Sequence, residues 1–578
     1  MTSHDSDDRD LRSIREARRL VESAALAAAR LASFSQEQLD AVLDALHAAA
    51  LPQAEPWARM AVEETGFGNV ADKILKNRFA TADLHRHIRP MRTVGILRQD
   101  DAAQVVEIAA PVGVVAAIIP STNPTSTAIY KILIALKAGN AVVLSPHPRA
   151  QRCVGAVART LAEAAVGAGA PPGAIACMTE PAIEGTNELM RHPAVGVILA
   201  TGGTGLVRAA YSSGKPAFGV GPGNVPAFVE RSADIGKAAR DIVAGKSFDH
   251  GVLCSSENAV VADRPIAGAL EAAMAAQGAR FLDETEAARL AALAVAPDGS
   301  LNTSIVGRAA TAIAAMAGIE APEGTRCLVA RLQGVGKAHP LSREKLSPIL
   351  AFYTEDGWEA CCERVLEILR YGGMGHTMSI HSRDRDIIMK FALAKPVFRI
   401  CVNTPASVGA VGVTTGLEPS MTLGCGALGG NITSDNIMPR HLLNVKRLAF
   451  EIRPFAGAEP SPTPRPEAGA LAAPALQAGP RGSPALPERP GPEEIRERVA
   501  RALARRPPGP AVPSAPQPGP ASHQGAGAAR TPAAVPFVSE ADVRQALLER
   551  RRIPVDRRTI ITPSARDLGQ EHHVFLPV

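Results

Sequence analysis

Apolar residues recur at two different periods along this chain of 578 residues. Between residues 11 and 66 they repeat at the spacing of a helix, at Ala17, Leu20, Ala24, Ala27, Leu31, Leu39, Val42, Leu43 and Leu46. From about residue 105 short apolar runs alternate with helical stretches. The pattern predicts a helical entry layer followed by an α/β body with a parallel sheet.

The alternation is clearest between residues 112 and 166. There it predicts a strand, a helix, a strand and a helix, at Val112–Ile119, Thr127–Lys137, Asn140–Leu144 and Ala150–Val166. More strand and helix units follow through Ser382. Apolar segments near 397–403 and 442–452 close the globular part of the chain.

A glycine-rich turn, Thr201–Gly205, lies between an expected strand at Val195–Ala200 and an expected helix at Leu206–Ser213. Backbone N–H groups of such a turn can face a phosphate at the start of a helix. A plain glycine turn is the alternative, because the G-x-G-x-x-G spacing of the dinucleotide fingerprint is missing. A second stretch, Gly219–Asn224, has no convincing strand before it and is interpreted as a loop that borders a site.

Composition and charge narrow the classes of function. The 62 Lys and Arg residues nearly balance the 57 Asp and Glu residues, so no nucleic-acid partner is implied. Met1–Asp10 is polar and acidic, unlike a secretory signal. The most apolar run, Val105–Pro120, is interrupted by Pro111 and Gly113 and is shorter than the ~20 residues of a membrane helix. We therefore expect a cytoplasmic protein of several domains with no membrane span.

Eight scattered cysteines form no C-x-x-C pair and have no histidine at metal-ligand spacing, so no metal site is expected. Most free cysteines are small buried hydrophobic residues. Cys254 has a distinctive setting, because it follows a turn of small residues at the mouth of an apolar strand. A thiolate at this position could attack a carbonyl carbon, and a buried core thiol is the alternative.

Beyond about Pro454 the composition changes abruptly, and 20 of the 47 prolines fall between residues 454 and 536. Such a stretch buries too little apolar surface to offset its chain entropy, and a flexible, disordered linker is expected. Within it, 492–506 predicts a short amphipathic helix with Ile495, Val499 and Leu503 on one face. A second helix is expected after Ser539, and 558–562 is a candidate strand.

Eight segments between about residues 55 and 453 resemble, in order, the aldehyde dehydrogenase superfamily. They are Ser121–Lys131, Gly139–Arg149, Thr201–Gly205, Tyr211–Asn224, Cys254–Glu257, Glu344–Pro348, Gly375–Thr377 and Leu423–Gly426. They look most like the acylating branch of that superfamily, including the aldehyde half of bifunctional aldehyde-alcohol dehydrogenase. Eight colinear motifs make a specific match.

The resemblance implies an aldehyde dehydrogenase fold. The expected parts are N-terminal helices and an NAD-binding domain at 1–225, a catalytic domain at 226–418, a return to the NAD-binding domain with an oligomerisation strand at 419–453, the linker at 454–537 and a C-terminal helical segment at 538–578. Strands near 101–109 and 444–453 would form an oligomerisation arm. A homodimer or homotetramer is implied.

The resemblance also assigns roles to individual residues. Cys254 becomes the nucleophile and Asn123 the side-chain donor to the oxyanion, with Thr122 in that role if the alignment shifts by one residue. The NAD contacts implied are Ser145, His147 and Pro148 for the adenosine part, Gly202, Gly203, Thr204 and Gly205 for the pyrophosphate, and Glu344 for the nicotinamide ribose. Val207 stands where family members often have a further glycine in this turn.

The acceptor of the acyl group follows from a missing carboxylate. Hydrolytic members of the family activate water with a glutamate in a loop that corresponds to Gly219–Asn224, and this loop has no carboxylate. A general base contributes about 10² to 10⁴-fold, so water attack should be slow, whereas a thiol is already partly ionised near neutral pH. The resemblance therefore favours coenzyme A. His376 is a candidate to assist CoA or, alternatively, a satisfied loop histidine, and Cys425 is interpreted as a packed residue of a turn.

Taken with the resemblance, the sequence predicts NAD-dependent oxidation of a short-chain aldehyde, such as acetaldehyde or propionaldehyde, to acyl-CoA. A hydrolytic dehydrogenase and a retired scaffold protein are the rivals. The segment 492–506 resembles the peptides that bring enzymes into bacterial microcompartments, so shell or cargo proteins are expected partners of the tail. A fortuitous helix in an Ala- and Arg-rich linker is the alternative.

Overall fold

The structure is a computed structural model that describes residues 3–296, 299–453 and, in the C-terminal part, 535, 537–538, 540–549, 551–556, 559–561, 565, 569 and 572–577. The chain divides into two compact units, Met1–Ser461 and Pro462–Val578. No helix among these residues is long and apolar enough to cross a membrane.

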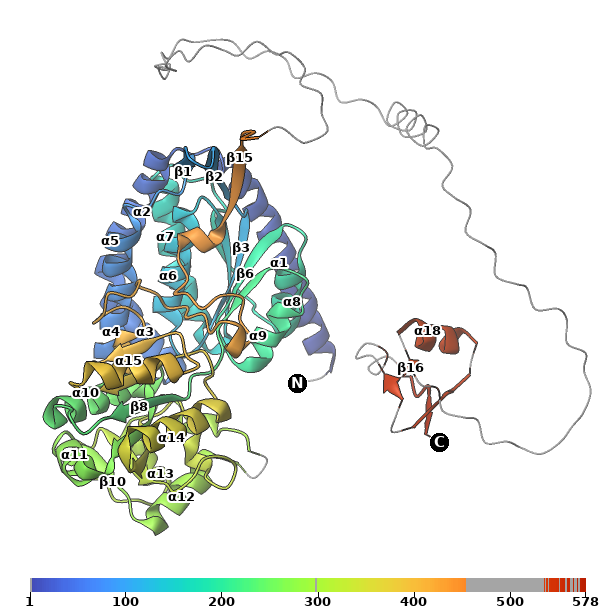
Figure 1. The fold of residues 1–578 in the computed structure, drawn as a ribbon. Coiled ribbons are helices and arrows are strands. Elements are labelled where there is room, and N and C mark those ends of the chain that lie inside the picture. The colour runs from blue at the N-terminus through green and yellow to red at the C-terminus, as the bar shows by residue number, and fades with distance from the viewer. Residues whose placement is uncertain are drawn as a thin grey trace, which may run out of the picture. The chain divides into compact units, whose positions relative to one another are not determined.

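The larger unit opens with a layer of helices, as the helical repeat predicts. They are α1 (Ser3–Leu31), α2 (Gln36–Ala50), α3 (Ala54–Thr65), α4 (Val70–Arg78) and α5 (Leu84–Ile88), with short turns η1 (Leu51–Gln53) and η2 (Phe79–Asp83) between them. A capping box starts α2: Gln38 N–H donates to Ser35 Oγ, and Ser35 N–H donates to Gln38 Oε1. In Figure 1, α1 lies on one face of the first sheet, and α2 lies on the other side, outside α6 and α7.

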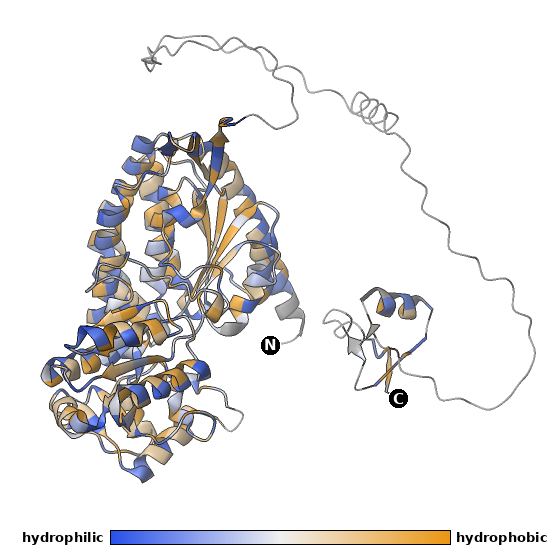
Figure 2. Cartoon of the chain, viewed as in Figure 1, coloured by the Kyte–Doolittle hydropathy of each residue, from blue (hydrophilic) through white to orange (hydrophobic). Residues whose placement is uncertain are grey.

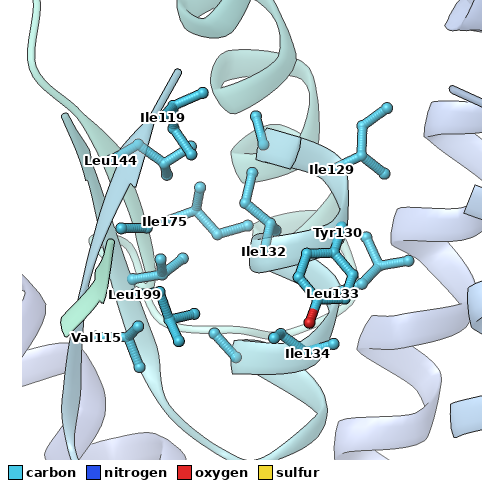
Figure 3. Packing of buried hydrophobic residues seen from close by; sticks show 14 of the residues in the cluster. Val115, Ile119, Ile129, Tyr130, Ile132, Leu133, Ile134, Leu144, Ile175 and Leu199 are labelled. Atoms are coloured by element: carbon cyan, nitrogen blue, oxygen red, sulfur yellow. The ribbon is translucent and has the colours of Figure 1, made fainter. Parts of the chain in front are cut away.

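The first sheet has five parallel strands in the order β5-β4-β3-β6-β7. They are β3 (Val114–Ile119), β4 (Ala141–Pro146), β5 (Ile175–Cys177), β6 (Val195–Ala200) and β7 (Ala217–Gly219), and the helices between them are α6 (Pro124–Lys137), α7 (Gln151–Gly167), α8 (Ile183–Arg191) and α9 (Thr204–Tyr211). Every residue of β3 and β4 is buried, as expected where helices cover both faces. Figure 3 shows Val115 and Leu144 of these strands packed against the side of α6 that carries Ile132.

The strand order of this sheet reverses at β3, which pairs with β4 on one side and β6 on the other. A crevice at such a switch point, outside the carboxyl ends of the strands, is where α/β sheets bind ligands. The buried Lys131 of α6 donates to the carbonyl oxygens of Ile118 in β3 (2.7 Å) and Leu199 in β6 (2.8 Å). Lys131 thereby ties the two strands together next to the crevice.

The second sheet has seven parallel strands in the order β10-β11-β12-β9-β8-β13-β14. They are β8 (Val225–Val229), β9 (Glu257–Asp263), β10 (Ala279–Phe281), β11 (Cys327–Arg331), β12 (Ile349–Glu355), β13 (Met378–His381) and β14 (Ile400–Val402). The accompanying helices are α10 (Ile235–Ser247), α11 (Arg264–Ala276), α12 (Glu284–Ala294), α13 (Ala310–Met316), α14 (Gly357–Tyr371), α15 (Arg385–Ala394) and α16 (Ala406–Gly409). Figure 2 shows that apolar residues predominate in the strands, as two-sided burial requires.

A third sheet is antiparallel and has the order β1-β2-β15. Its strands are β1 (Ile96–Asp100), β2 (Val105–Pro111) and β15 (Leu443–Ala449), so distant parts of the larger unit meet at the edge shown at the top of Figure 1. Leu448, Phe450 and Ile452 expose 49%, 56% and 67% of their surface. The position of this sheet is compatible with the expected oligomerisation arm, and the expected domain limits remain predictions.

The smaller unit has its own buried cluster, made of Val538, Val543, Ala546, Ile553, Ala565 and Val574. Its described elements are β16 (Phe537–Val538), α18 (Glu540–Leu548), β17 (Ile553–Val555), β18 (Ile560–Ile561) and β19 (Phe575–Pro577). Strands β16 and β18 pair in parallel, as do β17 and β19. The helix expected after Ser539 and the strand expected at 558–562 correspond to α18 and β18, whereas 492–506 lies outside the described residues.

The expectation that no strand precedes Gly219–Asn224 is wrong. The stretch Gly219–Asn224 follows a strand, β7, which pairs with β6 at Ala200 and Gly219. Three residues carry too little periodicity to reveal a strand, so only the pairing with β6 defines it.

Candidate active site

Cys254 lies in a tightly bent segment between α10 and β9. The 3-10 turn η4 (Phe248–Gly251) precedes it, and within this turn Asp249, His250 and Gly251 have φ values of 46°, 53° and 73°. Left-handed backbone at non-glycine residues costs about 1 to 3 kcal/mol each and persists only where the surroundings impose it. The bend leaves Cys254 half-buried, just ahead of the buried strand β9.

Asp249 holds this bend in place through contacts with α4. Its fully buried carboxylate accepts hydrogen bonds from Lys73 Nζ (2.9 Å), Lys76 Nζ and the Asn69 N–H (2.8 Å). Its own N–H donates to Asp72 Oδ2 (2.7 Å). Burial alone would raise the pKa of Asp249, but the two ammonium groups lower it below its usual value. The bend before Cys254 is therefore fixed by an ionised, buried carboxylate.

Asn123 lies at the end of β3, where α6 begins, and it reaches the same bend. Its side chain does not cap the helix. Instead, Oδ1 accepts from Lys76 Nζ (2.5 Å), and Nδ2 donates to the carbonyl oxygen of Val252 (3.4 Å) and to Thr122 Oγ1 (3.2 Å). The amide of Asn123 thus contacts a residue two positions before Cys254, and its role as donor to an oxyanion stays a prediction.

The loop Gly219–Asn224 passes directly over Cys254. A Cβ atom on Gly223 would lie 2.0 Å from the carbonyl oxygen of Cys254 and 3.2 Å from His376 Cε1. A Cβ atom on Gly221 would lie 4.0 Å from Cys425 Sγ. Because only glycine lets the two backbones approach this closely, residue 223 has to be glycine here. The interpretation of this loop as the border of a site agrees with its position.

Two titratable groups face this loop. Glu344 Oε1 accepts from the Gly223 N–H at 3.0 Å, and burial raises the pKa of Glu344 to about 7. His376 is fully buried, its Nδ1 lies 3.0 Å from Thr377 Oγ1, and its Nε2 has no hydrogen-bond partner among the described residues. Burial lowers the pKa of His376 to about 3, so its imidazole is neutral and one ring nitrogen is left without a partner.

The thiol of Cys254 is protonated in this arrangement. Its pKa is raised to about 12, mainly by burial and also by the carboxyl group of Glu344 and the thiol of Cys425, while the guanidinium of Arg399 acts in the opposite direction. Arg399 is itself buried and donates to the carbonyl oxygens of His376 (3.0 Å) and Gly424 (2.6 Å). A thiolate at Cys254 therefore needs a proton acceptor, and Glu344, with a pKa of about 7, is better matched to that task than His376, which binds a proton only weakly.

Apart from Glu344, the residues expected to bind the cofactor lie at the carboxyl ends of β4 and β6. Ser145 is buried and its Oγ lies 2.8 Å from Thr186 Oγ1, whereas His147 and Pro148 are exposed. Arg149 N–H donates to His147 Nδ1 (3.1 Å). Because β3, β4 and β6 are neighbours, their carboxyl ends bring these residues and Asn123 to one edge of the sheet.

The glycine turn after β6 has room for a ligand. A Cβ atom on Gly203 or Gly205 would meet nothing within 4 Å, whereas one on Gly202 would lie 2.5 Å from Leu206 Cδ2. The hydroxyl of Thr201 is buried without a hydrogen-bond partner among the described residues. Open space, free N–H groups at a helix start and an orphaned hydroxyl fit a dinucleotide pyrophosphate. Val207, which departs from the family pattern, packs towards Gly219.

The sequence analysis did not predict four residues that lie at the site. Lys73, Lys76, Asp249 and Arg399 are buried and hydrogen-bonded around Cys254 and Asn123. The only available signal was two lysines three residues apart on a helix, which is usually a solvated face. No cluster of three or more His, Cys, Asp or Glu residues able to hold a metal occurs in the part of the chain that the structure describes.

A parallel sheet with a switch point at β3 and a second parallel sheet with the half-buried Cys254 just ahead of β9 define this protein as an α/β fold with a cysteine site. A profile of the aldehyde dehydrogenase family matches residues 11–306, about half of the chain. The protein belongs to the aldehyde dehydrogenase family, which confirms both the resemblance and the α/β fold class predicted from the sequence.

Individual relatives agree with this assignment. Bifunctional aldehyde-alcohol dehydrogenase AdhE of Escherichia coli K12 is 41% identical over 442 residues, which are 75% of this chain and 49% of the relative. The chain spans about half the length of the aldehyde-alcohol dehydrogenases that it matches.

This chain aligns with two solved structures over nearly their whole length. An acetylating aldehyde dehydrogenase from Geobacillus thermoglucosidasius has a TM-score of 0.76 and 51% identity, covering 77% of this chain and 98% of that one. A Rhodopseudomonas palustris propionaldehyde dehydrogenase with bound CoA and an acylated cysteine has a TM-score of 0.69 and 30% identity, covering 75% and 97%.

Proposed function

We propose that this protein is an NAD-dependent, CoA-acylating aldehyde dehydrogenase that converts a short-chain aldehyde, such as acetaldehyde or propionaldehyde, into its acyl-CoA through a thioester on Cys254. The observation that carries the proposal is the loop Gly219–Asn224, which covers Cys254 closely and contains no carboxylate. The likeness to a structure with bound CoA and an acylated cysteine supports the same chemistry.

In the first step Cys254 Sγ attacks the carbonyl carbon of the aldehyde after its proton has passed to a neighbouring base. The new oxyanion is held by Asn123 Nδ2 and a backbone N–H near Cys254. NAD, when bound, would accept the hydride, and the residues that would hold it are the glycine turn Gly202–Gly205, Ser145, His147, Pro148 and Glu344. Collapse of the oxyanion releases the hydride and leaves an acyl group as a thioester on Cys254.

In the second step the thiol of CoA attacks the thioester carbonyl, and the Cys254 thiolate leaves as acyl-CoA forms. The same oxyanion donors serve both steps. The unpartnered Nε2 of neutral His376 beside the loop can accept a hydrogen bond from the CoA thiol, and the thiol proton ends on the leaving Cys254 sulfur, whose pKa is raised by burial. Water is a weaker nucleophile than a thiol, and the loop itself offers no carboxylate as a general base, which disfavours the hydrolytic rival.

A dimer or tetramer and a separate role for the tail belong to the same proposal. The exposed apolar residues Leu448, Phe450 and Ile452 at the third sheet are suited to an interface between copies. The small C-terminal unit has its own core, which favours a task apart from catalysis, such as docking on microcompartment shell proteins. Sedimentation analysis of the full chain and of a chain ending at residue 453, each with and without purified shell proteins, tests both parts.

The decisive experiment follows NADH formation from the purified protein with acetaldehyde or propionaldehyde, with and without CoA, next to Cys254→Ala. CoA-dependent NADH formation that the variant loses is the expected result. Turnover without CoA would point to hydrolysis. No turnover with any short aldehyde would favour the scaffold instead.

A further inference from the structure

The buried charges on α4 are not balanced by their shared partner. Lys73 and Lys76 are 1% and 5% exposed, and both donate to the same carboxylate oxygen of Asp249. Asp72 adds a second negative charge that favours the ammonium form of Lys76, but its Oδ2 accepts from the Asp249 N–H and from Asn69 Nδ2 and not from a lysine. One buried ammonium group is sufficient to neutralise the carboxylate of Asp249. A second buried ammonium group adds a further desolvation cost, because burying a charge is costly unless it is paired. The second lysine calls for another explanation.

The two lysines differ in what else they contact. Lys73 Nζ donates to a backbone group, the carbonyl oxygen of Thr122, at 3.2 Å. Lys76 Nζ donates to a side chain, Asn123 Oδ1, at 2.5 Å. An ammonium group has donors only, so it accepts one orientation of the amide and rejects the flipped one. With Oδ1 held by Lys76, Nδ2 of Asn123 faces the bend that carries Cys254.

We propose that Lys76 is a positioning residue for the reaction: it fixes the amide of Asn123 with Nδ2 towards the bend that carries Cys254. One buried cation thereby sets the geometry between the nucleophile and its oxyanion donor. The inference rests on the proposed function, because it takes Asn123 as that donor. Lys76 contacts neither Cys254 nor the substrate and acts through Asn123.

The test compares Lys76→Met with Lys73→Met, since both remove one ammonium from Asp249 but only the first releases the Asn123 side chain. With acetaldehyde, NAD and CoA, Lys76→Met should lower kcat by about 10² to 10³-fold, as the loss of one oxyanion donor does, with little change in KM. Lys73→Met should lower kcat by less than about tenfold. In an Asn123→Ala background, Lys76→Met should cause almost no further loss, because its effect passes through the missing amide.

The inference would be overturned if the loss of kcat in the double variant equalled the product of the two single losses. It would also be overturned if Lys73→Met lost as much kcat as Lys76→Met. If Lys76→Met does not fold, Lys76→Met combined with Asp249→Asn removes one charge of each sign and takes its place. An inactive wild-type protein would contradict the proposed function alone. In that case a crystal structure of Lys76→Met decides the inference: the Asn123 amide should turn away from the Val252 carbonyl, and an unchanged amide would refute it.

Discussion

Gly223 and Cys254 approach each other so closely that a Cβ atom on residue 223 would lie 2.0 Å from the carbonyl oxygen of Cys254. The contact joins a loop that follows the first sheet to the bend that precedes β9 of the second sheet. The position of the proposed nucleophile therefore depends on a residue without a side chain, 31 positions earlier in the sequence.

Gly223→Ala should reduce activity strongly, because the added methyl group pushes the Cys254 backbone away from its place. A misplacement of about 1 Å can cost about 10²-fold in rate. Gly221→Ala is the matched control in the same loop, since its Cβ atom would meet nothing closer than 3.6 Å. Steady-state kinetics and melting temperatures of both variants test this, and equal kcat values for the two would contradict it.

Gly203→Ala should weaken NAD binding without destabilising the protein. Residue 203 has a φ of −67° and open space around its Cβ position, so alanine fits the fold without strain. The methyl group would instead occupy space where the pyrophosphate would approach the backbone. Titration with NAD and thermal melting measure the two effects. A lower melting temperature with unchanged NAD affinity would place the cofactor elsewhere.

Glu344→Gln should change how stability depends on pH. Burial raises the pKa of Glu344 from 4.5 to about 7, so its contribution to stability is fully present below about pH 4.5 and is lost as the pH rises through about 7. The amide does not titrate. The melting temperature of the variant relative to wild type should therefore rise between about pH 4.5 and 7.5. Exposed Glu184→Gln is the control and should show no such trend.

Asp249→Ala should be among the most destabilising single changes in the larger unit. It leaves Lys73 and Lys76 buried without their carboxylate, and removing one partner of a buried pair costs about 3 to 5 kcal/mol. Glu55→Ala breaks the exposed pair with Arg59 and should cost less than about 1 kcal/mol. Denaturant unfolding of both variants gives the comparison, and similar losses would show that the buried cluster is not a structural anchor.

The local pattern of apolar residues was enough to predict most of the helices and strands. The strand expected at Val195–Ala200 has those bounds in the structure, and α7 (Gln151–Gly167) matches the helix expected at Ala150–Val166 within one residue. The helix expected at Thr127–Lys137 begins earlier, at Pro124, because proline at the first turn needs no N–H partner. These elements follow from apolar periodicity and turn residues, which act within a few positions of the chain.

The sequence by itself also singled out Cys254, Asn123 and the glycine turn, through the family motifs. Only the tertiary structure decided what surrounds them: Asp249 meets Lys76 across 173 positions of the chain, and β7 exists through its pairing with β6. Periodicity carries no information about such distant partners. Burial then sets the charge of each group, since the pKa values of Glu344, His376 and Cys254 depend on how completely the folded chain excludes water from them.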